Sequence, residues 1–374
     1  WPNNMLNFKV KQFVKIIMQN IVFPFFYRIG KIAPVDDRLV IFADSHHDDI
    51  PYSMEDLYQW FETTDYKVLK LTKDCDGGNY AGGLKFMLRF MLCYAKARYV
   101  FLCDNFLPAA SCNKREETTV VQMWHAGGML KKYAYDTPRD IPAYYKGNVF
   151  KNYSLILTSA EACNRAYVSG MRASPDIVKA LGLSRTDRFY QQRYKQLCED
   201  EFYAMYPEAR GKKIALWAPT FRGNASQPEI IDCSFIGHLR KQLGNEWFLV
   251  VNLHPHMQKH LKGEHCPIPT ERILPVTDVL ISDYSSVIYD YLLLMRPIVL
   301  YVPDLDYFEK NDQFYIDYNE MPGIIVKEES KLCDAIVHAE DRFDRDKMQR
   351  FKAKYMNACD GHALEKLVDY LQLS

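Results

Sequence analysis

The segment 276–301 constrains the fold more than any other part of this chain. It starts with an apolar strand at 279–281, turns through small polar residues, continues as a helix that opens at Ser285-Ser286, and ends in a second apolar strand at 297–302. This order is typical of parallel α/β sheets, which bind ligands at the carboxyl ends of their strands. Ser285 is a good N-cap residue, because its hydroxyl group can accept a hydrogen bond from an unpaired amide of the first turn. The other free amides and the positive end of the helix dipole attract phosphate, so we interpret this turn as a diphosphate cradle.

The same alternation of strands and helices recurs along the chain and predicts two α/β units. Further strand-like runs are found at 39–43, 67–71, 98–103, 119–124, 154–158, 213–217, 247–253 and 323–326. A charged, Tyr-rich helical stretch at 187–206 separates the two sets. We therefore predict an α/β fold with two Rossmann-like domains that face each other across a cleft. The expected parts are an N-terminal segment at 1–34, a first α/β domain at 35–195 and a second at 196–374.

Charge and cysteine content limit the function and the compartment. The 374 residues include 47 basic and 47 acidic side chains, so a general nucleic-acid-binding surface is not expected. Ten cysteines are scattered without a CxxC pair, which favours a reducing, cytosolic setting.

The N-terminal segment is basic and aromatic. No acidic residue lies between positions 5 and 31, where the basic residues are Lys9, Lys11, Lys15, Arg28 and Lys31. The apolar runs are shorter than the roughly 18 to 20 residues that a membrane-spanning helix needs. Two interpretations remain: a helix that packs on the protein, or an amphipathic segment that lies on an anionic membrane surface. We favour the membrane surface.

His125 follows a strand and precedes a Gly-Gly turn. Gly127 and Gly128 let a substrate approach the backbone closely, and Lys131 adds positive charge. A neutral imidazole could take a proton from an attacking alcohol. The alternative is a strand-end histidine that is bonded to a carbonyl group.

His254 also ends a strand, before Pro255. We expect its side chain to point into the same crevice, although a capped strand end with surface histidines is an alternative. Other potential metal ligands follow it, namely His256, His260, His265 and Cys266. Their spacing matches no standard zinc module, so we predict no metal site.

Four more polar residues near strand ends are candidates for the cleft. Thr220 and Arg222 could contact a phosphate, because a guanidinium group binds phosphate with two parallel hydrogen bonds. Asp290 lies four residues after Ser286 and could reach a ribose hydroxyl; the alternative is an exposed helical acid. Ser45 belongs to a polar loop at 43–49 that resembles a metal cluster, but we interpret this loop as one that lines the cleft.

Several ordered motifs resemble the CDP-glycerol glycerophosphotransferases of teichoic acid synthesis, over about residues 40 to 330. The matching stretches are Gln122-Met-Trp-His125, Gly182-Leu-Ser-Arg185-Thr-Asp187, Ala218-Pro-Thr220-Phe-Arg222, His254-Pro255, Ile281-Ser-Asp283-Tyr-Ser285-Ser286, Arg296-Pro297 and Tyr301-Val-Pro-Asp304. Two stretches depart from the family pattern: the chain reads Trp124-His-Ala-Gly-Gly-Met-Leu-Lys131, which looks closer to the primase type, and Ser184 replaces a proline.

The resemblance implies a glycosyltransferase-B-like architecture, with the acceptor on the first domain and the CDP-alcohol on the second. It implies that His125 and His254 are the essential pair. The implied diphosphate and nucleotide contacts are Thr220, Arg222, Ser285, Ser286 and Asp290, and the implied acceptor-side residues are Ser45, Gly127, Gly128, Lys131, Arg185 and Asp187.

The implied activity is transfer of glycerol phosphate from CDP-glycerol to a lipid-linked saccharide or a growing polymer, with release of CMP, at the cytoplasmic face of the membrane. We expect no required cofactor, although Mg²⁺ is possible. The alternatives are ribitol-phosphate transfer from CDP-ribitol, a nucleotide-sugar glycosyltransferase of the same fold, and a membrane-peripheral binding protein without activity.

Overall fold

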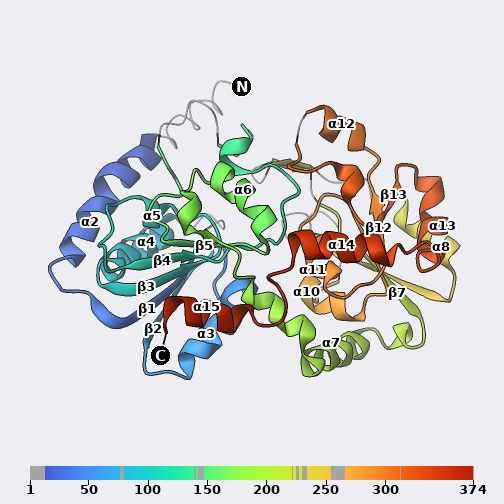
Figure 1. The fold of residues 1–374 in the computed structure, drawn as a ribbon, viewed down its shortest axis with the longest axis horizontal. Helices are drawn as coiled ribbons and strands as arrows, with labels where there is room; N and C mark the ends of the chain where they lie inside the picture. Colours follow the sequence, from blue (N-terminus) through green and yellow to red (C-terminus); the bar gives the residue numbers. More distant parts are fainter. Residues whose placement is uncertain are drawn as a thin grey trace.

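Two parallel β-sheets, one in each half of the chain, form the two lobes of the molecule (Figure 1). The computed structural model describes residues 13–75, 80–138, 140–141, 147–220, 222–224, 227–229, 234–253, 266–311 and 313–373. Within this part of the chain, the first sheet has six strands in the order β2-β1-β3-β4-β5-β6, and the second has five in the order β10-β7-β11-β12-β13. The predicted α/β architecture of two facing Rossmann-like units is thereby confirmed.

The strands of the first lobe are buried because helices cover both faces of the sheet. The last five residues of β1, from Val40 to Asp44, are all buried, as expected of a parallel strand in a sheet interior. The strands are β1 (Asp36–Asp44), β2 (Lys67–Thr72), β3 (Ala97–Leu102), β4 (Thr119–Gln122), β5 (Leu155–Leu157) and β6 (Val178–Lys179). The main helices are α2 (Phe23–Gly30), α3 (Tyr52–Glu62), α4 (Tyr80–Tyr94), α5 (Leu107–Ala110) and α6 (Glu161–Gly170). The sequence pattern missed β6, which has only two residues.

The second lobe repeats this plan. Its strands are β7 (Lys213–Trp217), β10 (Trp247–Val251), β11 (Val279–Ser282), β12 (Ile298–Tyr301) and β13 (Ile324–Val326), and a small antiparallel pair joins β8 (Arg222–Asn224) to β9 (Gln227–Glu229). The main helices are α7 (Gln192–Met205), α8 (Ile236–Leu243), α10 (Thr270–Ile273), α11 (Val287–Leu292), α12 (Leu305–Lys310) and α13 (Leu332–Val337). The predicted helical stretch at 187–206 corresponds to a 3-10 segment (Ser184–Tyr190) followed by α7.

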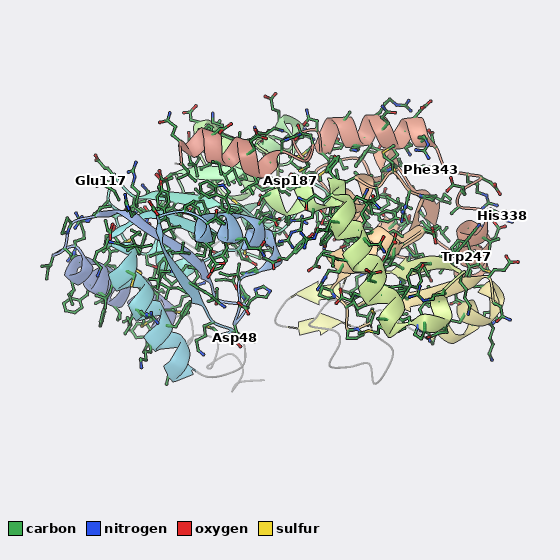
Figure 2. All side chains as sticks on the ribbon, turned by 90° about the horizontal axis from the view of Figure 1, so that it is seen from below. Asp48, Glu117, Asp187, Trp247, His338 and Phe343 are labelled. Carbon is green, nitrogen blue, oxygen red and sulfur yellow. The ribbon has the colours of Figure 1, made fainter. Side chains whose placement is uncertain are left out.

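The last two helices tie the lobes together. Helix α14 (Arg345–Tyr355) packs on α11 of the second lobe, whereas α15 (Ala363–Leu371) lies on the first lobe, where the Tyr99 hydroxyl group donates to the carbonyl of Leu371. Figure 2 shows both helices along one edge of the molecule, with Asp187 near their junction. The division of the chain at residue 195 remains a prediction, but the structure adds this return of the C-terminal helix to the first lobe.

The N-terminal helix has one face that packs on the first lobe and another face that is exposed. Residues 13–17 are helical, a π-helical turn follows at Met18–Val22, and α2 completes the helix, which packs on α4 through the buried Phe23 and Tyr27. Its outer face exposes large apolar side chains, namely Phe13, Val14, Ile16, Ile21, Phe25 and Ile29. Among the described helices, none has both the length and the apolar character needed to cross a bilayer. The helix therefore packs on the protein with one face and leaves an apolar face uncovered by any described residue.

Candidate functional site

A cavity of about 790 Å³ lies between the two lobes. Its walls come from the loops that follow β4 in the first lobe and β7, β11 and β12 in the second, which is the carboxyl-end edge where open α/β sheets bind ligands. Eight of the residues predicted for the site line it, namely His125, Gly127, Gly128, Lys131, Thr220, Arg222, Ser285 and Ser286. The second predicted histidine, His254, lies outside the described residues.

His125 is held on one edge and open on the other. Its Nδ1 atom is 3.2 Å from the carbonyl oxygen of Cys103 and 3.5 Å from Oδ2 of Asp104, and about half of its side chain is exposed. The ring of Trp124 stacks on the imidazole at a centroid distance of 4.6 Å. Trp124 itself has a φ of 58°, a left-handed conformation that is costly for a bulky residue and is often found at functional sites. The alternative interpretation, a strand-end histidine bonded to a carbonyl group, is thus partly correct, because Nδ1 contacts the carbonyl of Cys103. This contact does not involve Nε2.

The two glycines after His125 serve mainly the contact between the lobes. Gly128 has a φ of 68°, and a Cβ atom at this position would lie 2.0 Å from the ring of Tyr289 on α11. A Cβ atom at Gly127 would lie 3.1 Å from the sulfur of Met356. Both glycines line the cavity, but the expectation that they make room for a substrate needs correction, because a side chain of the other lobe fills the space beside Gly128.

A short β-bridge joins the lobes beside the cavity. The amide of Lys132 donates to the carbonyl of Gln313, and the amide of Tyr315 donates to the carbonyl of Leu130, each over 2.8 Å. These bonds fix the backbone around Lys131, which lines the cavity as predicted.

The predicted phosphate cradle lies opposite His125. Strand β11 ends in a turn, and the short helix α11 begins at Val287, whose amide donates to the hydroxyl group of Ser285 at 3.3 Å. The hydrogen bond predicted for the Ser285 hydroxyl group is thus present, although the helix boundary makes Ser286 the N-cap residue, one position later than predicted. Both serines are half-buried and line the cavity.

Arg222 is not arranged as predicted. All three guanidinium nitrogens are used within the protein: Nε and Nη2 donate to the carboxylate of Asp304, and Nη1 donates to Asp283 and to the carbonyl of Thr220. The two-bond contact with phosphate is therefore already taken by carboxylates. Thr220 differs, because its hydroxyl group is without a hydrogen-bond partner among the described residues, while its amide donates to Asp283.

Three other predicted site residues lie at the lobe junction instead of the cavity. Arg185 and Asp290 form an ion pair with an N–O distance of 2.5 Å, and their side chains are only 4% and 10% exposed. Asp187 accepts hydrogen bonds from the amides of Ala363 and Leu364, which begin α15. Because Asp290 is buried, it neither contacts a ribose nor stands as an exposed helical acid. Burial likewise contradicts a direct contact of Arg185 and Asp187 with the acceptor.

The polar loop after β1 forms its own ion pair. Asp44 is buried, and its Oδ2 is 2.8 Å from Nδ1 of His47. Burial raises the pKa of Asp44, but hydrogen bonds from His47 and from the His46 amide outweigh it and lower the pKa overall, while the bond to Asp44 raises the pKa of His47. Ser45 is half-buried and does not line this cavity, so its place in the cleft stays a prediction. Within the described ranges, no group of three potential ligands is arranged to hold a metal ion.

Sequence reasoning missed two groups around the cavity. Asp104 follows β3 by two residues and faces His125, and Gln122 is fully buried below Trp124. The first could have been found by the strand-end rule that located His125. The carboxylates that pair with Arg222 lay in quoted motifs, but their contact with it was not foreseen.

The arrangement can be compared with known proteins. The model of the CDP-glycerol:poly(glycerophosphate) glycerophosphotransferase family matches residues 25–373. The chain belongs to this family. It is 27% identical to the teichoic acid ribitol-phosphate primase of Bacillus spizizenii strain W23, over 97% of this chain and 98% of the primase. It is 26% identical to the teichoic acid glycerol-phosphate primase of Bacillus subtilis strain 168, over 73% of each chain.

Longer relatives and solved structures agree with this assignment. The match to the poly(ribitol-phosphate) polymerase of Bacillus spizizenii is 27% identical and covers 94% of this chain but 58% of the polymerase. The structure of the wall teichoic acid polymerase TagF aligns over 97% of both chains with a TM-score of 0.74 at 18% identity, which shows the same fold. A UDP-GlcNAc 2-epimerase from Methanocaldococcus jannaschii aligns over 90% of this chain with a TM-score of 0.55, as expected of a glycosyltransferase-B-like architecture. The chain is thus an enzyme of the teichoic acid phosphotransferase family.

Proposed function

We propose that the chain transfers glycerol phosphate from CDP-glycerol to a hydroxyl group of a membrane-lipid-linked saccharide or a growing teichoic-acid-like polymer, and releases CMP. The observation that carries this proposal is the cavity itself, which is lined by His125 from one lobe and by Thr220, Ser285 and Ser286 from the other. A base on one wall and hydroxyl donors on the opposite wall suit an alcohol and a diphosphate that meet between them. A primase-like role is favoured, because the primase of Bacillus spizizenii matches this chain over nearly its whole length.

In the proposed reaction, Nε2 of His125 takes the proton of the acceptor hydroxyl as its oxygen attacks the β-phosphorus of CDP-glycerol. The bond from oxygen to phosphorus forms, the bond from phosphorus to the bridging oxygen breaks, and CMP leaves with the electron pair. Ser285, Ser286 and Thr220 would hold the diphosphate, and Lys131 would add positive charge. Transfer of this kind depends mainly on positioning and electrostatics. His254 stays a predicted second histidine for the departing CMP.

Ribitol-phosphate transfer from CDP-ribitol is the second candidate. A specific observation favours it, since the primase with 98% of its length aligned acts, by its name, on ribitol phosphate. The two donors share the cytidine diphosphate and differ in the length of the polyol, so the same base and the same hydroxyl donors would serve both.

The test is to incubate the purified protein with a synthetic lipid-linked disaccharide and, separately, CDP-glycerol, CDP-ribitol and UDP-sugars. Mass spectrometry would identify the product and the released nucleotide. We expect CMP and a product that is heavier by one or more glycerol phosphate units, both abolished in His125→Ala. Faster turnover of CDP-ribitol would replace the first candidate by the second. UDP as the only released nucleotide would refute both in favour of a glycosyltransferase, and no turnover with any donor would favour a binding protein.

A metal ion is not part of the proposed scheme, because hydroxyl donors and basic side chains supply the contacts to the diphosphate. Turnover should persist in excess EDTA. Loss of activity in EDTA that is restored by Mg²⁺ would add the metal to the scheme.

We further propose that the N-terminal helix rests on the anionic cytoplasmic surface of the membrane. Ile21, Phe25 and Ile29 are spaced four residues apart and are 63%, 57% and 40% exposed, so they share one face of the helix. Arg28 and Lys31 lie at the C-terminal end of this helix, near Phe25 and Ile29. Basic residues beside exposed aromatic and aliphatic residues are typical of interfacial helices.

Point substitutions test this contact better than a deletion, because Phe23 and Tyr27 of the same helix are buried in the first lobe. Phe25→Asp should reduce sedimentation with vesicles that contain phosphatidylglycerol, while activity on a soluble acceptor analogue persists. Leu197→Asp is the matched control, since Leu197 is an exposed apolar residue, 49% exposed, on the distant helix α7. Equal sedimentation of the two variants would rule out the proposed surface.

A further inference from the structure

The two edges of the His125 ring have different surroundings. Nδ1 faces two oxygen atoms, the carbonyl of Cys103 at 3.2 Å and the carboxylate of Asp104 at 3.5 Å. Both are acceptors, so Nδ1 must carry a proton to interact with them favourably. In a neutral imidazole this leaves Nε2 as the acceptor, on the edge of the ring away from these oxygens.

The carboxylate of Asp104 is itself oriented. Its Oδ1 accepts a hydrogen bond from the amide of Asn105 at 2.6 Å, and Oδ2 is the atom that faces His125. The Asp104 side chain is 38% exposed, so it lies at the surface of the lobe and not in its apolar interior.

Gln122 joins the loop of Asp104 to the loop of His125. Its Nε2 group donates to the carbonyl of Asp104 at 2.9 Å, and its Oε1 accepts from the amide of Trp124 at 3.0 Å. This side chain is completely buried, and Tyr153 provides a further contact to Nε2 at 3.0 Å. One rigid amide therefore sets the distance between the end of β3 and the end of β4.

We propose that Asp104 is a positioning residue that holds His125 in the tautomer with the proton on Nδ1 and stabilises the imidazolium formed during transfer. This role rests on the proposed function. The acceptor proton moves to Nε2 as the bond to phosphorus forms and CMP departs with the electrons of the broken bond. The ring then carries a positive charge beside the carboxylate of Asp104, on the side opposite the new proton. A carboxylate in this position lowers the energy of the charged ring.

Other charges near this pair belong to neighbouring loops. Asp44 ends β1, His47 follows it, and Asp74 follows β2; the charges of Asp44, Asp74 and Asp104 all act on His47 at the same edge of the sheet. On the other side of His125 the neighbour is the uncharged ring of Trp124. Asp104 is the only carboxylate in an ion-pair contact with His125 among the described residues.

The tautomer can be measured without any substrate. In protein labelled with ¹⁵N at its ten histidines, the His125 signals are assigned by their loss in His125→Gln. We expect Nδ1 to carry the proton in the neutral wild-type ring. A proton on Nε2 instead would overturn the inference and rule out Nε2 as the proton acceptor, whereas the transfer of glycerol phosphate itself is tested separately by the product and the released nucleotide.

The contribution to transfer is tested with Asp104→Asn, which keeps the size and an acceptor oxygen but removes the charge. We expect kcat to fall by about tenfold, a fraction of the roughly 10²- to 10⁴-fold that a general base supplies, with KM for the donor within about twofold.

Asp48→Asn is the matched control. Asp48 is exposed in the loop after β1, and its Oδ1 accepts from the amide of Asp74, a bond that asparagine retains (Figure 2). This variant should keep the wild-type kcat and KM. An unchanged kcat in Asp104→Asn would refute the role of Asp104, even where His125→Ala is inactive. Activity in His125→Ala would instead refute the base that we propose for the reaction.

Discussion

The cavity wall around His125 and the lobe junction around Arg185 show two opposite uses of a charged side chain. Nδ1 of His125 is held by two oxygens while about half of the side chain stays open to the cavity. Arg185 is paired with Asp290 and is nearly inaccessible. Both residues occur in motifs of the same family, so motif membership alone does not separate chemistry from architecture. The difference lies in access: a side chain with an acceptor open to the cavity can react, and a buried ion pair holds parts together.

The largest expected effect comes from the open side chain. His125→Ala should lower kcat by roughly 10²- to 10⁴-fold, because it removes the proposed base. The Tm should change by no more than about 2 °C, since the side chain is half exposed and its loss leaves no buried charge. Steady-state kinetics and thermal unfolding would measure both. A large loss of Tm with normal turnover would show that His125 serves the stability of the fold and not the reaction.

Asp290→Asn should act on stability rather than on catalysis. It leaves the buried Arg185 charge without its partner, which costs about 3 kcal/mol. Urea unfolding should show the loss, while KM for the donor stays unchanged. Asp306→Asn is the control, because it breaks an ion pair with Lys327 in which Asp306 is 85% exposed, and such pairs contribute little. A raised KM with unchanged stability would restore the ribose contact that the structure contradicts.

Arg222 lies on the cavity wall but is paired like a junction residue, so it sharpens the comparison. Arg222→Lys keeps the positive charge but lacks the planar fork that reaches both Asp283 and Asp304. We expect a loss of about 2 kcal/mol in the free energy of unfolding, because Asp283 is only 2% exposed. A fall in donor affinity without any loss of stability would show that Arg222 binds the phosphate directly.

The sequence predicted the sheets and the edge of the site because these follow from local patterns. Buried parallel strands are continuous apolar runs, and polar residues at their ends collect at one edge. Pairing over long distances leaves no such pattern. Arg185 and Asp290 are 105 residues apart, and Arg222 and Asp304 are 82 apart. The fit of Gly128 against Tyr289 likewise depends on how the lobes meet, which no local pattern encodes.

The cradle should give a smaller effect than the charged residues. Ser286→Ala removes one hydroxyl donor from the cavity wall but leaves α11 without change, because the Ser286 side chain makes no capping bond. We expect KM for the donor to rise by about three- to tenfold, equivalent to about 1 kcal/mol for one hydrogen bond, with little change in kcat. Thr118→Ser is a control for hydroxyl chemistry away from the cavity, since Thr118 is buried and donates to the carbonyl of Ala97. An unchanged KM in Ser286→Ala would place the diphosphate elsewhere on the wall.

The smallest effect concerns a second strand-end histidine that is paired with a carboxylate. The pKa of Asp44 is lowered in the folded protein, so its contribution to stability is present above about pH 4 and is lost as the pH falls through the lowered value. The pKa of His47 is raised, so its contribution is complete below about pH 6.5 and is lost as the pH rises through the raised value. The pair should therefore stabilise the fold mainly between about pH 4 and 6.5.

His47→Asn should lower the Tm by at most about 2 °C at pH 6 and by less at pH 9, because the His47 side chain is 59% exposed and solvent screens the pair. Thermal unfolding of both proteins at the two pH values measures this difference. Turnover should not change, since His47 is bonded through Nδ1 like His125 but lies outside the cavity lining. A loss of turnover in His47→Asn would contradict this expectation. It would mean that a histidine at a strand end can take part in the reaction through its open ring nitrogen even when it does not line the cavity.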